Sequence, residues 1–303
     1  MHLTLRQLTV FESVARHMNF SRAAEEMHLS QPAASMQVKQ LEENIGLPLF
    51  EQLGKKIFLT EAGQELLHYA RSIKQQVEEA QTALEELKGL HRGTLHLTMA
   101  STANYFAPQL LAAFHEKYPD AKVQLDVTNR SGLIEAVRNN TTDMAIMGRP
   151  PAGQGLVGMP FMNNPLVIIA PPAHPLAGRK MIKLQELAQE PFIVRESDSG
   201  TRIAAERFFA EHGIQLITGM EMNRSEAIKQ AVMAELGLGI VSLHTIDMEL
   251  ALKRLVVLKV EDFPIMRQWH IVYRQGKRFS AIPKAFMEFV KAHAEELTPT
   301  PEV

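Results

Sequence analysis

The hydrophobic and polar positions of residues 1–60 predict three short helices. Apolar side chains recur at helical spacing between Leu5 and His17, and Ser21 is the predicted N-cap of a short second helix. Ser30 is the predicted N-cap of a third helix, which has Pro32 in its first turn. Two short helices joined by a tight link are typical of a helix-turn-helix. The face that the third helix is expected to bury consists of Ala34, Val38, Leu41 and Ile45.

Two short apolar segments follow the third helix, around 49–52 and 57–59. Gly54, Lys55 and Lys56 join them, so the pattern predicts a small hairpin, or wing, with a basic tip.

Residues 60–92 carry a seam of apolar positions that alternate in steps of four and three. This heptad pattern favours a helix that dimerises as a coiled coil, and the alternative is a helix that lies on its own domain. Gly89 and Gly93 are expected to end the helix. The predicted dimerisation positions are Leu66, Ala70, Ile73, Val77, Ala80, Leu84 and Leu87.

Strand and helix patterns alternate along residues 93–303, which predicts an α/β fold with parallel or mixed sheets. The expected strands are 94–100, 122–128, 143–148, 166–170, 191–195, 218–222, 238–242 and 268–274. The expected helices include 103–117, 131–139, 201–212, 225–236 and 281–296. This region is large for one sheet, so we expect two lobes with a cleft between them, joined by crossover strands around 165–178 and 267–274.

The outward face of the third helix has small residues near its start and polar residues further on. An α-helix fits the major groove of B-DNA, where Gln31 and Gln40 could meet base edges and Met36 a thymine methyl group. The alternative is a plain amphipathic surface helix. Lys39 and the wing lysines are expected at phosphates, although the latter could serve only to keep a hairpin tip soluble. The candidate DNA-binding residues are Ser21, Arg22, Ser30, Gln31, Pro32, Ala33, Ser35, Met36, Lys39, Gln40, Lys55 and Lys56.

Composition and motifs limit the classes of protein to which the chain could belong. The chain has 32 basic and 34 acidic side chains, so bulk charge points to no nucleic-acid partner, and affinity for DNA would have to come from local placement or several copies. There is no cysteine, no apolar run of the ~18 residues that span a membrane, and no signal-peptide pattern, so we expect a cytoplasmic protein without disulfides. The histidines show no metal-ligand spacing, and no P-loop or nucleophile elbow is present.

The segment "FSRAAEEMHLSQPAASMQVKQLEENIGLPLFEQLGKKIFLTEAG" resembles the DNA-binding domain of the LysR-type transcriptional regulators, and the layout of the remaining chain is similar to that family. The resemblance implies a winged helix-turn-helix at 1–59, a dimerising linker helix at 60–92 and an effector-binding domain at 93–303. That last domain would be Rossmann-like and two-lobed like a periplasmic binding protein, with lobe I at about 93–165 and 267–303 and lobe II at about 166–266. It further implies a homotetramer that bends promoter DNA.

Three predicted strand-to-helix junctions carry hydroxyl and amide side chains beside arginines. Helix N-termini suit anions, and ligands of open α/β sheets bind at the carboxyl ends of strands. For any single Ser or Thr the alternative is an ordinary N-cap. LysR-type sensors similarly use the loops at 101–102, 128–129 and 201–202. The candidate effector-binding residues are Ser101, Thr102, Asn104, Thr128, Asn129, Arg130, Arg149, Thr201 and Arg202, with Arg149 and Arg202 as expected phosphate ligands.

The N-terminal half looks most like the subgroup that regulates Calvin-cycle carbon-fixation operons. That resemblance implies a regulator without a cofactor, either an activator or a repressor, which responds to an effector such as ribulose bisphosphate or NADPH. The partners it implies are promoter DNA, further copies of the chain, the effector and RNA polymerase, and no membrane. The alternatives are a LysR-type regulator of sulfur or aromatic-acid metabolism, a cytoplasmic solute-binding protein and an α/β enzyme.

Overall fold

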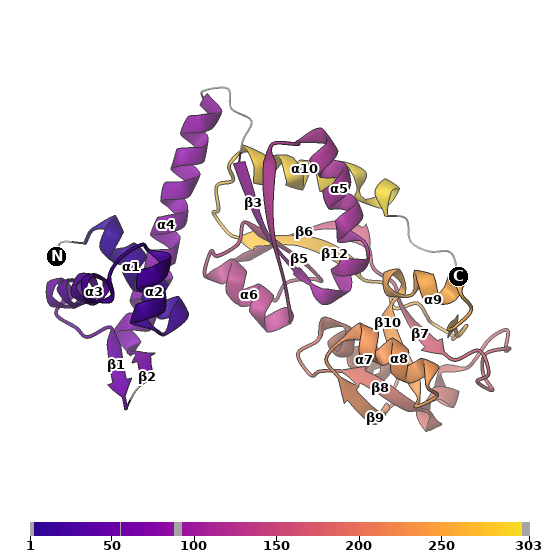
Figure 1. Cartoon of the computed structure of the whole chain (residues 1–303). Helices are drawn as coiled ribbons and strands as arrows, with labels where there is room; N and C mark the ends of the chain where they lie inside the picture. The colour runs from indigo at the N-terminus through magenta and orange to yellow at the C-terminus, as the bar shows by residue number, and fades with distance from the viewer. Residues whose placement is uncertain (1–2, 55, 88–92, 299–303) are drawn as a thin grey trace. The chain divides into compact units, whose positions relative to one another are not determined.

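The computed structural model describes residues 3–54, 56–87 and 93–298 of the chain, which forms a smaller N-terminal and a larger C-terminal unit (Figure 1). Lys55 and Gly89 therefore lie outside the described residues. The winged helix-turn-helix, the long helix after it and the two α/β sheets confirm the fold class expected from the sequence.

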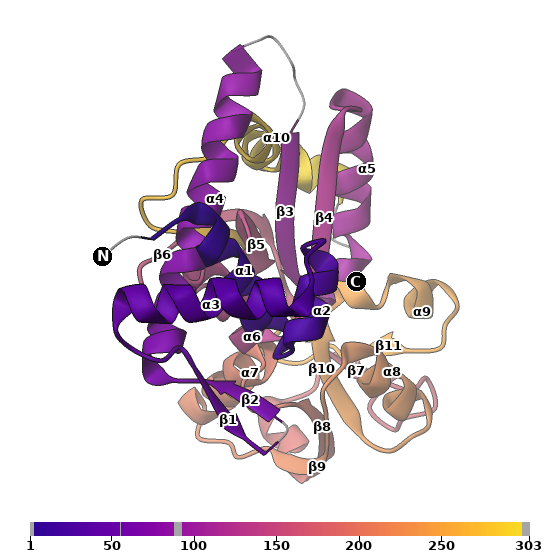
Figure 2. The same cartoon turned by 60° about the vertical axis from the view of Figure 1, so that its left-hand side comes forward.

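The N-terminal unit is a helix-turn-helix followed by a hairpin (Figure 2). The helices share a small core in which Val10, Val14, Ala23, Ala34 and Val38 are buried. The elements are α1 (Leu5–His17), α2 (Phe20–Glu26), α3 (Gln31–Ile45), β1 (Phe50–Leu53) and β2 (Lys56–Leu59), and the two strands pair antiparallel.

The helix caps agree with the sequence at α3 and differ at α2. The Ser30 hydroxyl accepts a hydrogen bond from the Ala33 amide at 3.3 Å, which confirms the predicted N-cap. The cap of α2 is Asn19 instead of Ser21, because the Asn19 side-chain oxygen accepts from the amides of both Ser21 and Arg22. Ser21 is thereby placed inside the first turn of the helix.

The long helix α4 (Glu61–Leu87) belongs to the N-terminal unit and packs its first half on the helix-turn-helix. Ala70 is buried there, and Leu66 and Ile73 are partly buried against the cluster that contains Phe11 and Leu41. Three of the seven predicted seam positions thus contact their own domain, which was the alternative considered for the whole helix. Further along, Val77 is half-buried and Ala80 and Leu84 are exposed, whereas the side chain of Leu87 lies outside the described residues.

The C-terminal unit contains two five-stranded mixed sheets, one in each lobe. The lobe I sheet has the order β4-β3-β5-β12-β6, with β3 parallel to β4 and β5. The lobe II sheet has the order β11-β7-β10-β8-β9, with β8 parallel to β9 and β10. The strands are β3 (Gly93–Ala100), β4 (Ala121–Thr128), β5 (Met144–Met147), β6 (Leu156–Asn163), β7 (Leu166–Ala170), β8 (Pro191–Arg195), β9 (Ile217–Met222), β10 (Leu238–Ser242), β11 (Val256–Val257) and β12 (Gln268–Arg274).

Helices cover both faces of each sheet. In lobe I, α5 and α10 pack on one face around Phe114 and Phe286, and α6 packs on the other through Leu133 and Val137. In lobe II, α7 and α8 lie in separate hydrophobic clusters of the same sheet. The helices are α5 (Ala107–Lys117), α6 (Arg130–Arg138), α7 (Gly200–Glu211), α8 (Ser225–Met233), α9 (Asp247–Ala251) and α10 (Ala281–Leu297), with 3-10 turns η1 (Ser101–Tyr105), η2 (Leu184–Gln189) and η3 (Leu243–Thr245).

Two crossings side by side connect the lobes. The chain leaves lobe I between β6 and β7 and returns just before β12. The Asn164 amide donates to the Arg267 carbonyl at 2.8 Å, and the Leu166 amide donates to the Ile265 carbonyl at 3.0 Å. The crossings therefore precede the strands that the sequence indicated, since β7 belongs wholly to lobe II and β12 to lobe I.

Some elements differ from the sequence prediction. The expected helix 103–117 is divided into η1 and α5, because Pro108 lies in the first turn of α5 and has no amide hydrogen for a continuous helix. The sequence analysis did not identify β6, β11 or α9. Of these, β6 contains Gly158 and Pro160, residues that weaken a strand pattern.

Candidate functional site

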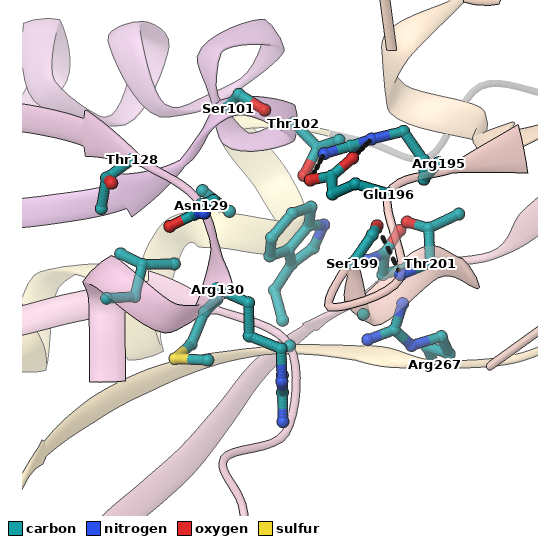
Figure 3. Close-up of a pocket in the computed structure, with 17 residues that line it drawn as sticks. Ser101, Thr102, Thr128, Asn129, Arg130, Arg195, Glu196, Ser199, Thr201 and Arg267 are labelled. Atoms are coloured by element: carbon teal, nitrogen blue, oxygen red, sulfur yellow. Dashed lines mark hydrogen bonds and ion pairs between the residues drawn. The ribbon is translucent and has the colours of Figure 1, made fainter. Parts of the chain in front are cut away.

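A cavity lies between the two lobes, and both lobes and the returning crossing contribute to its walls (Figure 3). Polar side chains predominate in the lining. The residues are Ala100, Ser101, Thr102, Thr128, Asn129, Arg130, Leu133, Met147, Gly148, Asn164, Arg195, Glu196, Ser199, Gly200, Thr201, Arg267 and Trp269.

The lobe I wall is built where two parallel strands end. Ser101 and Thr102 begin η1 directly after β3, and Thr128 is the last residue of the neighbouring β4. The Asn129 side-chain oxygen accepts from the Gly132 amide at 3.0 Å, so Asn129 caps α6 and turns Arg130 into the cavity lining. This is the arrangement that the strand-to-helix junctions predicted.

The lobe II wall is also built at the carboxyl end of a strand. Arg195 ends β8, and Ser199 caps α7 by accepting from the Thr201 amide at 3.3 Å. The Arg195 guanidinium is buried and binds the Glu196 carboxylate through two nitrogens at 2.7 and 2.8 Å. A third nitrogen donates to the Ser225 hydroxyl at 3.1 Å. Arg195 is therefore held rigidly and its charge is largely compensated by Glu196.

Arg267 enters the cavity from the returning crossing. Burial lowers its pKa to about 10, and the nearby positive charges of Arg130 and Arg207 act in the same direction. Within the described part of the chain, no carboxylate lies within ion-pair distance of the Arg267 guanidinium. A Cβ at Gly148 would collide with Nη2 of Arg267, so a larger residue at that position would require the guanidinium to move. The cavity thus contains a buried guanidinium whose charge is not compensated by a carboxylate of the described residues.

Arg130 adds a second positive charge on the same side. Its Nη2 donates to the Arg149 carbonyl at 3.2 Å, and burial lowers its pKa while the charge of Asp198 opposes that change. Arg130, Arg267 and the amides at the start of α7 together form a donor-rich, positively charged region. Such a region is suited to a small anion that carries a phosphate or carboxylate group.

Three of the predicted effector residues do not line this cavity. The Arg202 guanidinium is held by the Glu206 and Glu221 carboxylates and donates to the Arg195 carbonyl at 2.9 Å, so its donors are engaged elsewhere. Arg149 contributes its carbonyl to Arg130, and its side chain is not in the lining. Asn104 is exposed on η1. The arginines expected to take phosphate are replaced in the lining by Arg195 and Arg267.

The sequence analysis missed Arg195, Glu196, Ser199 and Arg267. Arg195 could have been identified, because it is the last residue of a predicted buried strand and the carboxyl ends of strands carry ligand contacts. No local pattern identifies Arg267, since its position depends on where the returning crossing meets Gly148.

A second candidate surface lies on the N-terminal unit. In α3 the side chains of Ala34, Val38 and Leu41 are buried, which leaves the opposite face free. The exposed predicted contacts are Ser21, Arg22, Ser30, Gln31, Pro32, Met36, Lys39, Gln40 and Lys56, with Ala33 and Ser35 partly buried. Lys55 lies outside the described residues. The exposed face combines small residues, amide donors and cations, as entry into a DNA groove requires.

No helix in the described part of the chain is long and apolar enough to cross a membrane. The described residues also contain no cluster of three or more histidines and carboxylates that could hold a metal ion.

A helix-turn-helix joined to a two-lobed domain with a polar cleft is the architecture of an effector-responsive transcriptional regulator. Residues 5–64 match the family described as "Bacterial regulatory helix-turn-helix protein, lysR family", and residues 88–295 match "LysR substrate binding domain". The chain belongs to the LysR family of transcriptional regulators, which are not enzymes. This family membership also excludes the transport solute-binding alternative.

Individual members of the family and solved structures are similar to this chain over much or all of its length. A RuBisCO operon transcriptional regulator from Allochromatium vinosum is 55% identical over 98% of both chains. The regulatory domain of Synechocystis PCC6803 CcmR in complex with 2-PG is 38% identical, with a TM-score of 0.65, and covers 68% of this chain and 99% of its own. Full-length CbnR complexed with target DNA has a TM-score of 0.68 over 96% of this chain and 99% of its own. It is 22% identical, so it shows the shared fold alone.

Proposed function

We propose that this LysR-family protein controls a carbon-fixation operon in response to a small phosphorylated anion bound between its lobes. The observation that carries the ligand class is the buried Arg267 guanidinium, which has no carboxylate partner among the described residues. The sequence similarity to a RuBisCO operon transcriptional regulator, 55% identical over 98% of both chains, supports the choice of operon.

The cavity chemistry supports a phosphorylated ligand over an apolar one. Arg130 and Arg267 supply charge, and the hydroxyls of Ser101, Thr102 and Thr201 supply further donors. A phosphate accepts several charge-assisted hydrogen bonds, so it would compensate a buried guanidinium well. The similar CcmR regulatory domain was solved with 2-PG, an anionic metabolite. Ribulose bisphosphate and NADPH remain candidates of the same chemistry.

We further propose that the three regions of the chain have separate functions. Residues 1–59 would bind operator DNA, with Gln31, Ser35 and Gln40 of α3 at base edges and Lys39 and Lys56 at phosphates. Residues 60–92 would dimerise, and 93–303 would bind the effector. Several copies on one DNA would add their contacts, which offsets the near-neutral charge of a single chain.

Titration of the full-length protein would test the ligand class. Trp269 is the single tryptophan of the chain and belongs to the cavity lining, so its fluorescence reports on the cleft. The panel would contain 2-PG, ribulose bisphosphate, NADPH, phosphoenolpyruvate, sulfate and cis,cis-muconate. Saturable binding of phosphorylated compounds is expected. Binding of sulfate or muconate alone would move the protein to another regulon and contradict the phosphate assignment.

The linker helix supplies a separate prediction. Leu84 is 60% exposed on α4, as expected of a residue that contacts a second copy. Leu84→Glu should convert dimers to monomers, because it would bury a carboxylate in an apolar seam. Analytical ultracentrifugation measures the change. Gln64→Glu places a similar charge on the opposite side of α4 and should leave the dimer intact. An unchanged dimer for Leu84→Glu would remove this position from the interface.

A further inference from the structure

A hydrogen bond and a ring contact join the two lobes at one side of the cavity. Tyr105 ends η1 in lobe I, and its hydroxyl donates to Oε2 of Glu226 in lobe II at 3.0 Å. The Lys229 ammonium, also in lobe II, lies 4.6 Å from the centre of the Tyr105 ring. Tyr105 thus contacts both members of an ion pair across the lobe boundary.

On the lobe II side of this contact, the Lys229 ammonium is buried and held by three acceptors. The Lys229 side chain is only 2% exposed, and its Nζ lies 2.8 Å from both the Glu226 and the Glu249 carboxylates. It also donates to the Thr245 carbonyl at 2.9 Å. Three acceptors match the three protons of an ammonium group. The hydrogen bond from Lys229 leads the effects that lower the pKa of Glu226 to about 2, so Glu226 is an ionised acceptor for Tyr105 at neutral pH.

The lobe I side of the contact is continuous with the cavity wall. Ser101 and Thr102, which line the cavity, and Tyr105 belong to the same short turn η1. The next residue, Phe106, packs on Trp269 with ring centres 5.0 Å apart and on His244 of lobe II at 5.7 Å. A movement of η1 relative to lobe II would therefore alter the cavity wall and break the Tyr105 contact together.

We propose that Tyr105 is a positioning residue for effector affinity, which acts by holding η1 and lobe I against the Glu226–Lys229 ion pair of lobe II. The proposal rests on the proposed function, because it takes the ligand to bind in the cavity between the lobes. The contact requires the lobes to be together, so it favours the closed form. Ligand affinity then falls in proportion to the closed fraction when the contact is removed.

The test compares two substitutions of Tyr105 in the full-length protein, with 2-PG as the probe and Trp269 fluorescence as the signal. Tyr105→Phe keeps the ring over Lys229 and loses the hydroxyl, and should raise the dissociation constant about threefold. Tyr105→Leu loses both contacts and should raise it about tenfold. Tyr118→Phe removes a hydroxyl elsewhere in lobe I and should leave it unchanged.

Melting temperatures separate positioning from a merely structural role. A structural role predicts a lower melting temperature for Tyr105→Leu with the affinity of wild type. That result, or an equal loss of affinity in Tyr118→Phe, would overturn the proposal. A graded loss of affinity from phenylalanine to leucine supports it. If the wild-type protein bound neither 2-PG nor inorganic phosphate, the anion-binding function itself would fail, and the role of Tyr105 with it.

Discussion

Arg267→Met should abolish effector binding, with the dissociation constant for 2-PG raised at least about a hundredfold. The guanidinium is buried beside Arg130, and no carboxylate in the described part of the chain compensates it. A bound phosphate would be its main counter-charge, and hydrogen bonds between charged partners contribute roughly 1.5–3 kcal/mol each. Loss of two such bonds accounts for the expected effect. Titration monitored by Trp269 fluorescence measures it.

The same substitution should stabilise the unliganded protein. Burial, and after it the positive charges of Arg130 and Arg207, lower the pKa of Arg267 to about 10, which corresponds to a penalty of roughly 3 kcal/mol for keeping the charge in the folded protein. Folded and unfolded chains both keep this proton below pH 10, so the whole penalty is present at neutral pH and is relieved only as the pH rises above about 10. Methionine removes the charge, and we expect the melting temperature to rise by a few degrees between pH 6 and 9.

Arg179→Met is the matched control for both effects. Arg179 binds the Glu186 carboxylate on the surface of lobe II and is not in the cavity lining. Its substitution should change neither 2-PG affinity nor melting temperature appreciably, since exposed ion pairs contribute little. Wild-type affinity in Arg267→Met would show that the anion binds elsewhere. Lost affinity with a lower melting temperature would show that Arg267 holds the fold together.

Local patterns predicted the N-terminal unit and most of the α/β elements because the decisive interactions are between residues close in sequence. The cap at Ser30 and the buried face of α3 are examples. The seam of α4 shows the limit of such patterns. A heptad pattern records which side of a helix is apolar, and Leu66, Ala70 and Ile73 use that side to cover their own domain. The pattern cannot distinguish that use from contact with a second chain.

Among the residues around the cavity, too, some could be predicted from the local sequence and others depend on tertiary contacts. Ser101, Thr128 and Asn129 were predicted because a strand end determines their place. Arg202 follows the same rule and is nevertheless turned away, since Glu221 from a different strand binds it. Arg267 reaches the cavity because the returning crossing lies beside the outgoing one and Gly148 leaves room for its guanidinium. Those facts depend on tertiary contacts that no short segment contains.

Gln31→Ala in α3 should reduce discrimination between operator and random DNA by about 5- to 150-fold, which corresponds to roughly 1–3 kcal/mol for a lost base contact. Gln31 is the first residue of α3, exposed, and lies where a recognition helix meets base edges. The helix itself should survive, because the Ser30 cap is bonded to the Ala33 amide and alanine is a good helix former.

Binding to operator and random fragments at several salt concentrations would separate base contacts from phosphate contacts. Lys39→Ala should weaken binding to both DNAs about equally and reduce the slope of log affinity against log salt by about one. Gln76→Ala on the exposed surface of α4 should change neither. If Gln31→Ala weakened both DNAs equally, Gln31 would contact the backbone and not a base. An effect on the operator alone, with an unchanged salt slope, would assign it to sequence recognition, since a base contact releases no counterions from phosphate.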